Sequence, residues 1–273
     1  MSTSRLRHAL RAIRARAYVR IVGANREISW LLGEVLLPIV ALAAYIFIYR
    51  SLGAPSRYEA IVVLGGAMIP FWLGVLWSMA SQFYWEKEMG NLDLYMASPM
   101  EPVWLLLGMA LGGMFMSTVR AAGVLVFGVL IFGVDFTVRQ PLLLAVIFVL
   151  TLTALFSMGM AASSVYFMVG RVGIKLNMIL MEPVYFLSGL FFPVNKFGKV
   201  LLTLAALLPL TVGLDGVRQL MIPDAKGIGF LAPPVEAAIL LVMTIVFTIG
   251  AMKLMKALEI KGKHDGTMTL RWQ

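Results

Sequence analysis

Three ionisable residues lie inside long apolar stretches of the chain: Glu34, Arg120 and Glu182. A charged side chain near the middle of a membrane helix costs on the order of 2.5 to 3.5 kcal/mol on insertion scales, so it normally faces a charged partner or a water-filled cavity. Groups of this kind form buried ion pairs, or relay ions and protons. We expect Arg120 and Glu182 to lie at one depth and to pair. Glu34 stands nearer the end of its stretch, where its side chain can extend to the interface.

Little else in the chain could carry out catalysis. There is no cysteine, and the two histidines, His8 and His264, both stand outside the apolar stretches. The sequence therefore offers no thiolate metal site, no buried Ser–His pair and no membrane metalloprotease motif. The run 193–200 comes nearest to a Walker A phosphate loop, but Pro193 replaces its first glycine and Val200 replaces its Ser or Thr. We expect no catalytic residue, no metal and no cofactor on this chain.

The composition predicts an all-α membrane protein. Of the 273 residues, 60% are hydrophobic and 14% are charged, which is too apolar for the interior of a soluble domain of this size. The apolar runs are continuous and approach the roughly 20 residues that cross the hydrocarbon layer as a helix, without the alternation of membrane strands. We expect a single transmembrane domain over residues 1–273. Its six predicted spans lie at about 30–49, 60–83, 106–133, 141–168, 174–192 and 235–255.

The basic residues indicate which end of the protein faces the cytoplasm. With six spans and an internal N-terminus, most of the 23 Lys and Arg residues fall in the N-terminal segment, in two internal loops and in the tail 256–273. Cytoplasmic segments of multi-pass proteins carry such an excess. We therefore expect both termini in the cytoplasm. The net charge of +9 then reflects topology and contact with anionic lipid head groups rather than nucleic-acid binding.

Residues 1–26 are predicted to form an amphipathic helix along the membrane surface. Apolar residues recur there at helical spacing while arginines occupy the other faces. The apolar positions are Leu6, Leu10, Ile13, Ala17 and Ile21. Two other interpretations remain open, a disordered basic leader and an organellar transit peptide. No cleavable signal peptide is expected, because no short apolar core with a small-residue cleavage site follows the basic start.

A short polar insert, residues 86–100, separates the second and third expected spans. The insert opens with the charged residues Glu86-Lys87-Glu88 and closes with Ser98-Pro99. Between them, apolar residues fall at i, i+3 and i+4: Leu92, Tyr95 and Met96. This pattern predicts a short amphipathic helix that ends before the proline. Such a helix fits a groove of another protein. An ordinary polar loop accounts for the pattern equally well.

The region 193–232 is predicted to dip into the membrane without crossing it. Its apolar run, Val200 to Leu214, is about 15 residues long and contains Pro209, so it is too short and too interrupted for an ordinary span. We expect a re-entrant or interfacial hairpin on the outer face. A seventh span is the alternative, but it would place the C-terminus outside, against the distribution of basic residues.

Three stretches resemble, in the expected order, the ABC type-2 exporter permeases. Residues 88–93, closed by Ser98-Pro99, are similar to the family's cytoplasmic loop between its second and third spans. Residues 188–193 resemble the end of the fifth span. Residues 208–218, with Leu-Pro-Leu-Thr followed by Asp215 and Arg218, resemble the segment that comes next. The likeness extends over nearly the whole chain.

The resemblance implies roles for two groups of residues. The insert would contain the coupling helix that contacts an ATPase subunit, with site residues Glu86, Glu88, Gly90, Leu92, Asp93, Tyr95, Met96 and Pro99. The hairpin would consist of two half-helices that help to close the exit of the path, with gate residues Gly189, Phe191, Phe192, Pro193, Pro209, Asp215 and Arg218. Two positions depart from the family pattern: Asn91 stands where Thr is common, and Met89 where a basic residue is common.

The resemblance also implies a transport subunit rather than an enzyme. ATP and Mg would bind to a separate ATPase chain, and a pair of permeases would work with a pair of ATPase subunits. The complex would lie in the cytoplasmic (inner) membrane of a bacterium or archaeon, in contact with membrane lipid. Its exported substrate would be hydrophobic or amphipathic, for example a drug, a lipid, or a lipid-linked glycan or polysaccharide.

Two other function classes are compatible with the sequence. An ion- or proton-coupled secondary transporter or channel could use Glu34, Arg120 and Glu182 as a relay. Such proteins often show repeated halves and helices broken at the midplane, whereas this chain has no convincing internal repeat. A non-transporting membrane scaffold would need no coupling helix. The exporter permease is the hypothesis we prefer.

Overall fold

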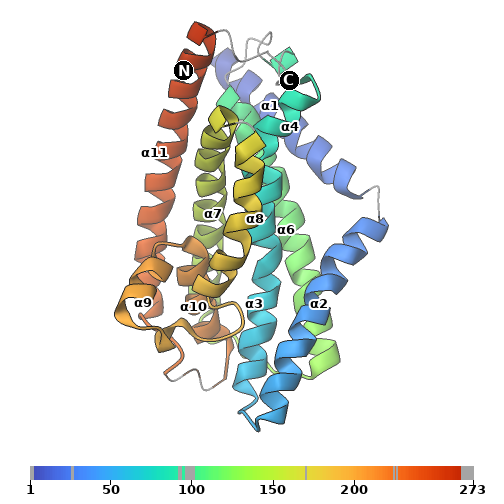
Figure 1. Ribbon diagram of the computed structural model, residues 1–273, viewed down its shortest axis with the longest axis vertical. Helices are drawn as coiled ribbons and strands as arrows, with labels where there is room; N and C mark the ends of the chain where they lie inside the picture. The colour runs from blue at the N-terminus through green and yellow to red at the C-terminus, as the bar shows by residue number, and fades with distance from the viewer. Residues whose placement is uncertain are drawn as a thin grey trace.

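The computed structural model describes residues 3–25, 28–91, 94–95, 102–169, 171–223, 225 and 227–265. All regular secondary structure in these residues is helical, so the predicted all-α fold is confirmed. The long helices form a bundle (Figure 1): α2 (Ile28–Ser51), α3 (Arg57–Leu73), α6 (Pro102–Phe132), α7 (Pro141–Val169), α8 (Arg171–Leu187) and α11 (Pro233–Asp265). The remaining elements are α1 (Thr3–Asn25), the π-helix η1 (Gly74–Ala80), α4 (Gln82–Glu88), the 3-10 turn η2 (Val194–Lys196), α9 (Lys199–Ala206) and α10 (Pro209–Met221).

Among the described residues, five segments are long and apolar enough to cross a membrane. They are α2, α3 continued by η1, α6, α7 and α11, and they match five of the six predicted spans. The sixth, predicted over 174–192, is shorter in the structure, because α8 has 17 residues and ends at Leu187. Gly189, with a φ of +61°, ends the helix in the left-handed conformation that glycine adopts readily.

The centre of the bundle is α3. Figure 1 shows α3 running through the middle, with α2 on one flank and α11 on the other. Every residue from Ala60 to Trp72 is buried, as expected for a stretch without charged, amide or hydroxyl side chains. At Gly65 the backbone of Leu190 approaches so closely that a Cβ would lie 1.5 Å from its carbonyl oxygen. On the outside, α11 packs along α7, and the hydroxyls of Ser157 and Thr248 lie 2.9 Å apart.

The predicted N-terminal helix is present as α1, so residues 3–25 are not a disordered leader. It runs obliquely at one end of the bundle, which we call the α1 end (Figure 1). α1 packs closely on α6 at two glycines. A Cβ at Gly108 would lie 2.7 Å from the carbonyl oxygen of Ile13, and a Cβ at Gly112 would lie 2.8 Å from Cβ of Arg20. The face packed on α6 includes Ile13 and Ala17 of the predicted apolar face, while Leu10 of that face is 57% exposed.

The predicted re-entrant hairpin is present at the opposite end, which we call the hairpin end. α9 and α10 meet at a bend of 98°. The chain enters and leaves the hairpin at this end, since Asn195 donates to the carbonyl of Gly227, while a Cβ at Gly213 would meet Thr151, deep along α7. The end of α10 lies beside the start of α7, because Thr137 N–H donates to Met221 O at 2.9 Å. The described ends of α1 and α11 lie together at the α1 end (Figure 1).

Candidate functional site

The segment that leads to the predicted coupling helix is a nearly continuous helical rod. α3 passes into the π-helix η1 and then, after Ser81, into α4. At the junction the Ser81 N–H donates to Leu76 O, five residues back, at 3.2 Å. Single turns with this wider spacing are frequent at functional sites. The rod connects the buried centre of the bundle with the polar surface at the α1 end.

Asn177 of α8 holds this junction. Its fully buried amide donates to Leu76 O at 3.1 Å and to Ser81 Oγ at 2.6 Å. Ser81 Oγ in turn donates to Leu76 O at 3.1 Å. The sequence analysis did not select Asn177, although a single amide between the apolar residues of α8 was a visible signal. Asn177 therefore joins α8 to the rod at this junction.

Glu86 is the centre of a buried polar cluster at the α1 end. Its carboxylate accepts hydrogen bonds from Gln82 Nε2 at 2.7 Å, Asn91 Nδ2 at 3.0 Å and Tyr95 OH at 3.1 Å, and it forms an ion pair with Arg16 of α1. We call these five residues the Glu86 cluster. Because Glu86 is only 3% exposed, its role in this structure is to position α1 and the insert rather than to contact another subunit directly.

Arginines surround a cavity of about 330 Å³ beside the Glu86 cluster. Arg16, Arg20 and Arg120 line it together with Gln82 and Glu86. Arg20 donates to Gln82 Oε1 at 3.0 Å. Burial, together with the positive charges of Arg120 and Arg16, lowers the pKa of Arg20 to about 10. α1 is thus joined to α4 by charged and polar contacts as well as to α6 by close backbone packing.

The intramembrane ion pair is not the predicted one. Arg120 Nε lies 2.5 Å from Glu34 Oε2, whereas Glu182 is exposed on α8. The reason is the packing of α2 on α6, where a Cβ at Gly123 would contact Val35 at 3.1 Å, so that the neighbouring Glu34 faces Arg120. The prediction that Arg120 pairs with Glu182 is wrong, and so is the expectation that Glu34 extends alone to the interface.

At the hairpin end, Arg218 joins three segments. Its side chain is fully buried and donates to Leu190 O at 2.7 Å, to Ile61 O at 3.0 Å and to Phe192 O at 3.4 Å. These carbonyls belong to α3 and to the turn after α8. A buried charge is tolerated only with several such partners. Arg218 therefore fixes the hairpin against the centre of the bundle.

A second buried polar group brings Asp215 together with Glu236 of α11. Gln219 Nε2 donates to Asp215 Oδ2 at 2.9 Å, to Glu236 Oε1 at 3.2 Å and to Leu231 O at 2.7 Å. Phe230 N–H also donates to Asp215 Oδ2 at 3.0 Å. The sequence analysis missed Glu236, although a carboxylate in the first turn of the last apolar run was a signal. These contacts attach α10 and the following loop to the last span.

The structure places the other predicted gate residues around the same hairpin. Phe191 stacks on Tyr45 with ring centroids 4.0 Å apart, and its carbonyl accepts from Tyr49 OH at 3.0 Å. Phe192 packs edge-on against Phe197. Pro193 and Pro209 are buried, and Gly189 forms the turn before them. The gate residues therefore form one assembly, while their action as a gate remains a prediction.

The structure describes only some of the predicted coupling residues. Glu88 is half-buried, and Gly90 follows α4 with a φ of +75°. Tyr95 belongs to the Glu86 cluster, and its ring centroid also lies 5.5 Å from Cζ of Arg16. The remaining predicted residues, Leu92, Asp93, Met96 and Pro99, lie outside the described residues. In the part of the chain that the structure describes, no group of three or more acidic, His or Cys side chains could hold a metal ion.

A comparison with protein families gives a match over most of the chain. The model of the family described as ABC-2 type transporter matches residues 11–222. The chain belongs to the ABC-2 type transporter family. A comparison with curated proteins gives no significant match.

The matched region contains the elements described above. It begins within α1, includes α4 and the Glu86 cluster, and ends directly after α10. This ABC-2 protein is therefore a multi-pass membrane permease subunit of an ABC transporter. The match therefore includes the Glu86 cluster and Arg218, whereas Glu236 lies beyond its end.

Proposed function

We propose that this chain is the permease of an exporter whose ATP is hydrolysed by a separate subunit. ATP and Mg bind to that ATPase, which contacts the permease at α4 and the insert 86–100. The observation that carries the proposal is the Glu86 cluster, because it ties α1, α4 and the insert into one polar unit at the start of a rod that reaches the bundle centre. Membership of the ABC-2 type transporter family supports the same reading.

In this mechanism the force enters at the α1 end. Closure of two ATPase subunits displaces α4, and the displacement passes along η1 to α3 and, through Asn177, to α8. Rigid helices joined at a few polar contacts move as units, which is the usual way in which a small local change becomes a large one. A path then opens between this permease and a second copy of it.

The hairpin end closes the exit. Arg218 holds α10 to the turn 188–193 and to α3. A displacement of α3 therefore also displaces the hairpin. We assign the α1 end to the cytoplasm of a bacterium or archaeon, in agreement with the excess of basic residues in α1, and the hairpin end to the outer face. The substrate is hydrophobic or amphipathic: a drug, a lipid, or a lipid-linked glycan or polysaccharide.

Purification of the tagged protein from gently solubilised membranes tests the proposal. The matched variants are Gly90→Val and Gly227→Val, because both glycines have a left-handed φ, +75° and +76°, but lie at opposite ends of the bundle. Valine strains both turns equally. We expect an ABC ATPase to co-purify with the wild type and with Gly227→Val. In Gly90→Val we expect the ATPase activity to be lost, or ATP hydrolysis to continue without export.

Two results would contradict the proposal. Equal ATPase recovery and coupling in the two variants would place the coupling contact elsewhere. Absence of an ATPase, together with transport that depends on an ion gradient, would favour an ion-coupled transporter in which the Glu34–Arg120 pair takes part.

A further inference from the structure

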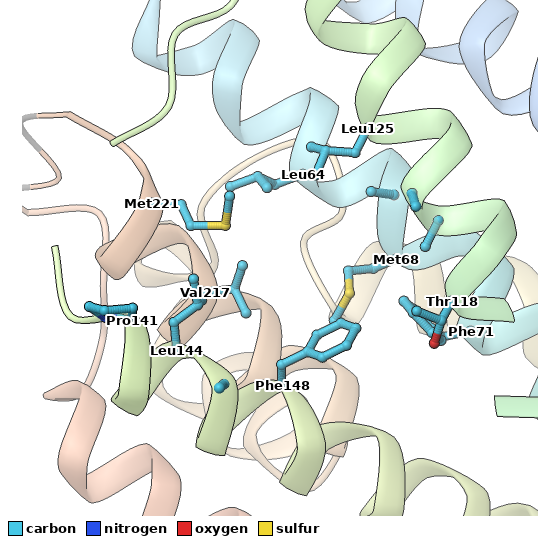
Figure 2. Close-up of a pocket in the computed structure, with 14 residues that line it drawn as sticks. Leu64, Met68, Phe71, Thr118, Leu125, Pro141, Leu144, Phe148, Val217 and Met221 are labelled. Carbon is cyan, nitrogen blue, oxygen red and sulfur yellow. The ribbon is translucent and has the colours of Figure 1, made fainter. Parts of the chain in front are cut away.

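A cavity of about 370 Å³ lies among α3, α6, α7 and α10, on the hairpin half of the bundle. Figure 2 shows side chains from these helices around an open space, with Leu64 and Met68 on one side and Leu144, Val217 and Met221 on the other. The hollow exists because several of its lining residues are alanines, whose short side chains leave the space between the helices unfilled.

The lining of this cavity is almost purely hydrocarbon. Thr118 is the only polar residue among those that line it, and its hydroxyl donates to Met114 O at 2.8 Å. Phe71 and Phe148, edge to face at 5.7 Å, close its deep end. Water needs two to four polar partners, and even apolar cavities of roughly 150 Å³ stay dry and take up hydrocarbon. The cavity is therefore suited to an apolar ligand.

Its position selects the kind of apolar ligand. The lining residues of α3, α6 and α7 lie within segments that can span a membrane, and Ala122 and Ala145 are exposed where the cavity opens to the side. Along α7 the lining extends from Pro141 to Phe148, about 10 Å of helical rise. A cavity of this length, open at the side of the bundle, fits one linear hydrocarbon chain.

A cation stands beside the mouth of the cavity. Arg139 is exposed two residues before Pro141, and its N–H donates to Leu220 O of α10 at 3.1 Å, so the loop that carries it is fixed at the hairpin end. Arginine side chains bind phosphate groups through paired, charge-assisted hydrogen bonds. The acyl cavity and the cation thus match the two parts of a phospholipid.

We propose that the cavity binds one acyl chain of a resident membrane phospholipid, with its phosphate near Arg139. The chain fills the space between α10 on one side and α3 and α6 on the other. It therefore supports the hairpin from the side opposite to its contact with α11. The site opens between α6 and α7, at Ala122 and Ala145, and it shares no lining residue with the cavity beside the Glu86 cluster.

Photolabelling with a phospholipid that has a diazirine on its acyl chain tests this assignment. The intact protein, with its co-purifying partners, is placed in vesicles of phosphatidylcholine and phosphatidylglycerol that contain the probe, and labelled residues are mapped by mass spectrometry. The filling variants are Ala121→Phe, within the cavity, and Ala145→Phe, at its exposed opening. The control is Ala238→Phe, on the exposed surface of α11.

We expect the wild type to label Leu144 and Val217 several-fold more than the exposed Val242 of α11. Both filling variants should reduce this labelling to the level at Val242, while Ala238→Phe leaves it unchanged. Ala145→Phe keeps the test valid if Ala121→Phe does not fold, because position 145 is exposed. Labelling no higher than at Val242, or unaffected by filling, would overturn the proposal. Labelling that disappears during ATP turnover would also overturn it, because the occupant would then be cargo.

Discussion

Replacement of Glu86 tests how much of the α1 end depends on one carboxylate. Glu86→Ala leaves Arg16 without its ion-pair partner and removes the acceptor for Gln82, Asn91 and Tyr95. Breaking a buried ion pair by removing one partner costs about 3 to 5 kcal/mol. For a chain of this size, each kcal/mol lowers the unfolding temperature by roughly 2 to 4 °C. We therefore expect a decrease of about 6 to 20 °C.

Glu86→Gln separates the charge from the hydrogen bonds. Glutamine keeps the volume and one acceptor oxygen but turns an NH₂ group toward other donors, so its cost should be smaller, about 1 to 3 kcal/mol. Thermal unfolding in lipid nanodiscs, followed by tryptophan fluorescence, measures both variants. Glu182→Ala is the matched control, because that carboxylate is exposed and its removal should change stability by no more than about 0.5 kcal/mol.

A double-mutant cycle identifies the partner. Combining Glu86→Gln with Arg16→Gln should cost less than the sum of the single changes, with an interaction energy of about 0.5 to 3 kcal/mol. The reasoning would be refuted by an unfolding temperature for Glu86→Ala that matches the Glu182→Ala control, or by strictly additive single changes. Either result would mean that α1 is held by its packing on α6 alone.

Three further substitutions test the other assemblies. Asn177→Leu removes the donor to Leu76 O and Ser81 Oγ. We expect the free energy of unfolding to fall by about 1 to 3 kcal/mol and ATP hydrolysis to be no longer coupled to transport. Unchanged stability together with unchanged coupling would contradict the proposed link between α8 and the rod. Gly108→Leu should displace α1, because the obstructing atom is the Ile13 carbonyl oxygen, and hydrogen exchange in residues 3–25 should rise. Glu236→Gln keeps an acceptor for Gln219 but removes one of two adjacent carboxyl groups, so the unfolding temperature should stay or rise, and a fall of several degrees would contradict this.

The sequence was informative wherever a property extends along the chain. Continuous apolar runs located five spans, and the short run around Pro209 predicted the hairpin, because length and composition alone decide whether a helix can cross a bilayer. The helical spacing of the apolar residues predicted a helix over residues 1–26, and the structure has one at Thr3–Asn25. These features need no knowledge of which faces of two helices meet.

The sequence was less informative wherever two helices must be rotated correctly against each other. Arg120 was assigned to Glu182 by depth alone, but the rotation of α2 on α6 brings Glu34 to it instead. The helical spacing in residues 1–26 predicted an amphipathic helix at the membrane surface, but it did not show that Arg16 and Arg20 would pack on Gly108 and Gly112 of α6. Asn177 and Glu236 stood out locally as single polar residues between apolar neighbours, but their partners lie across the bundle, so the sequence did not indicate what they bind.

The π-helix between α3 and α4 sets how α4 is turned relative to the rest of the bundle. A π turn carries one residue more than an α turn, and each helical residue accounts for about 100° of rotation, since 3.6 residues complete a turn. Deleting one residue from Gly74–Ala80 would therefore leave α3 in place while swinging Glu86 about a quarter of the way around the helix axis, away from Arg16. The direction in which α4 and the Glu86 cluster face around the α3 axis is thus set by one residue buried inside the bundle. If the proposed coupling contact is correct, an insertion or deletion there redirects the contact surface without altering its residues.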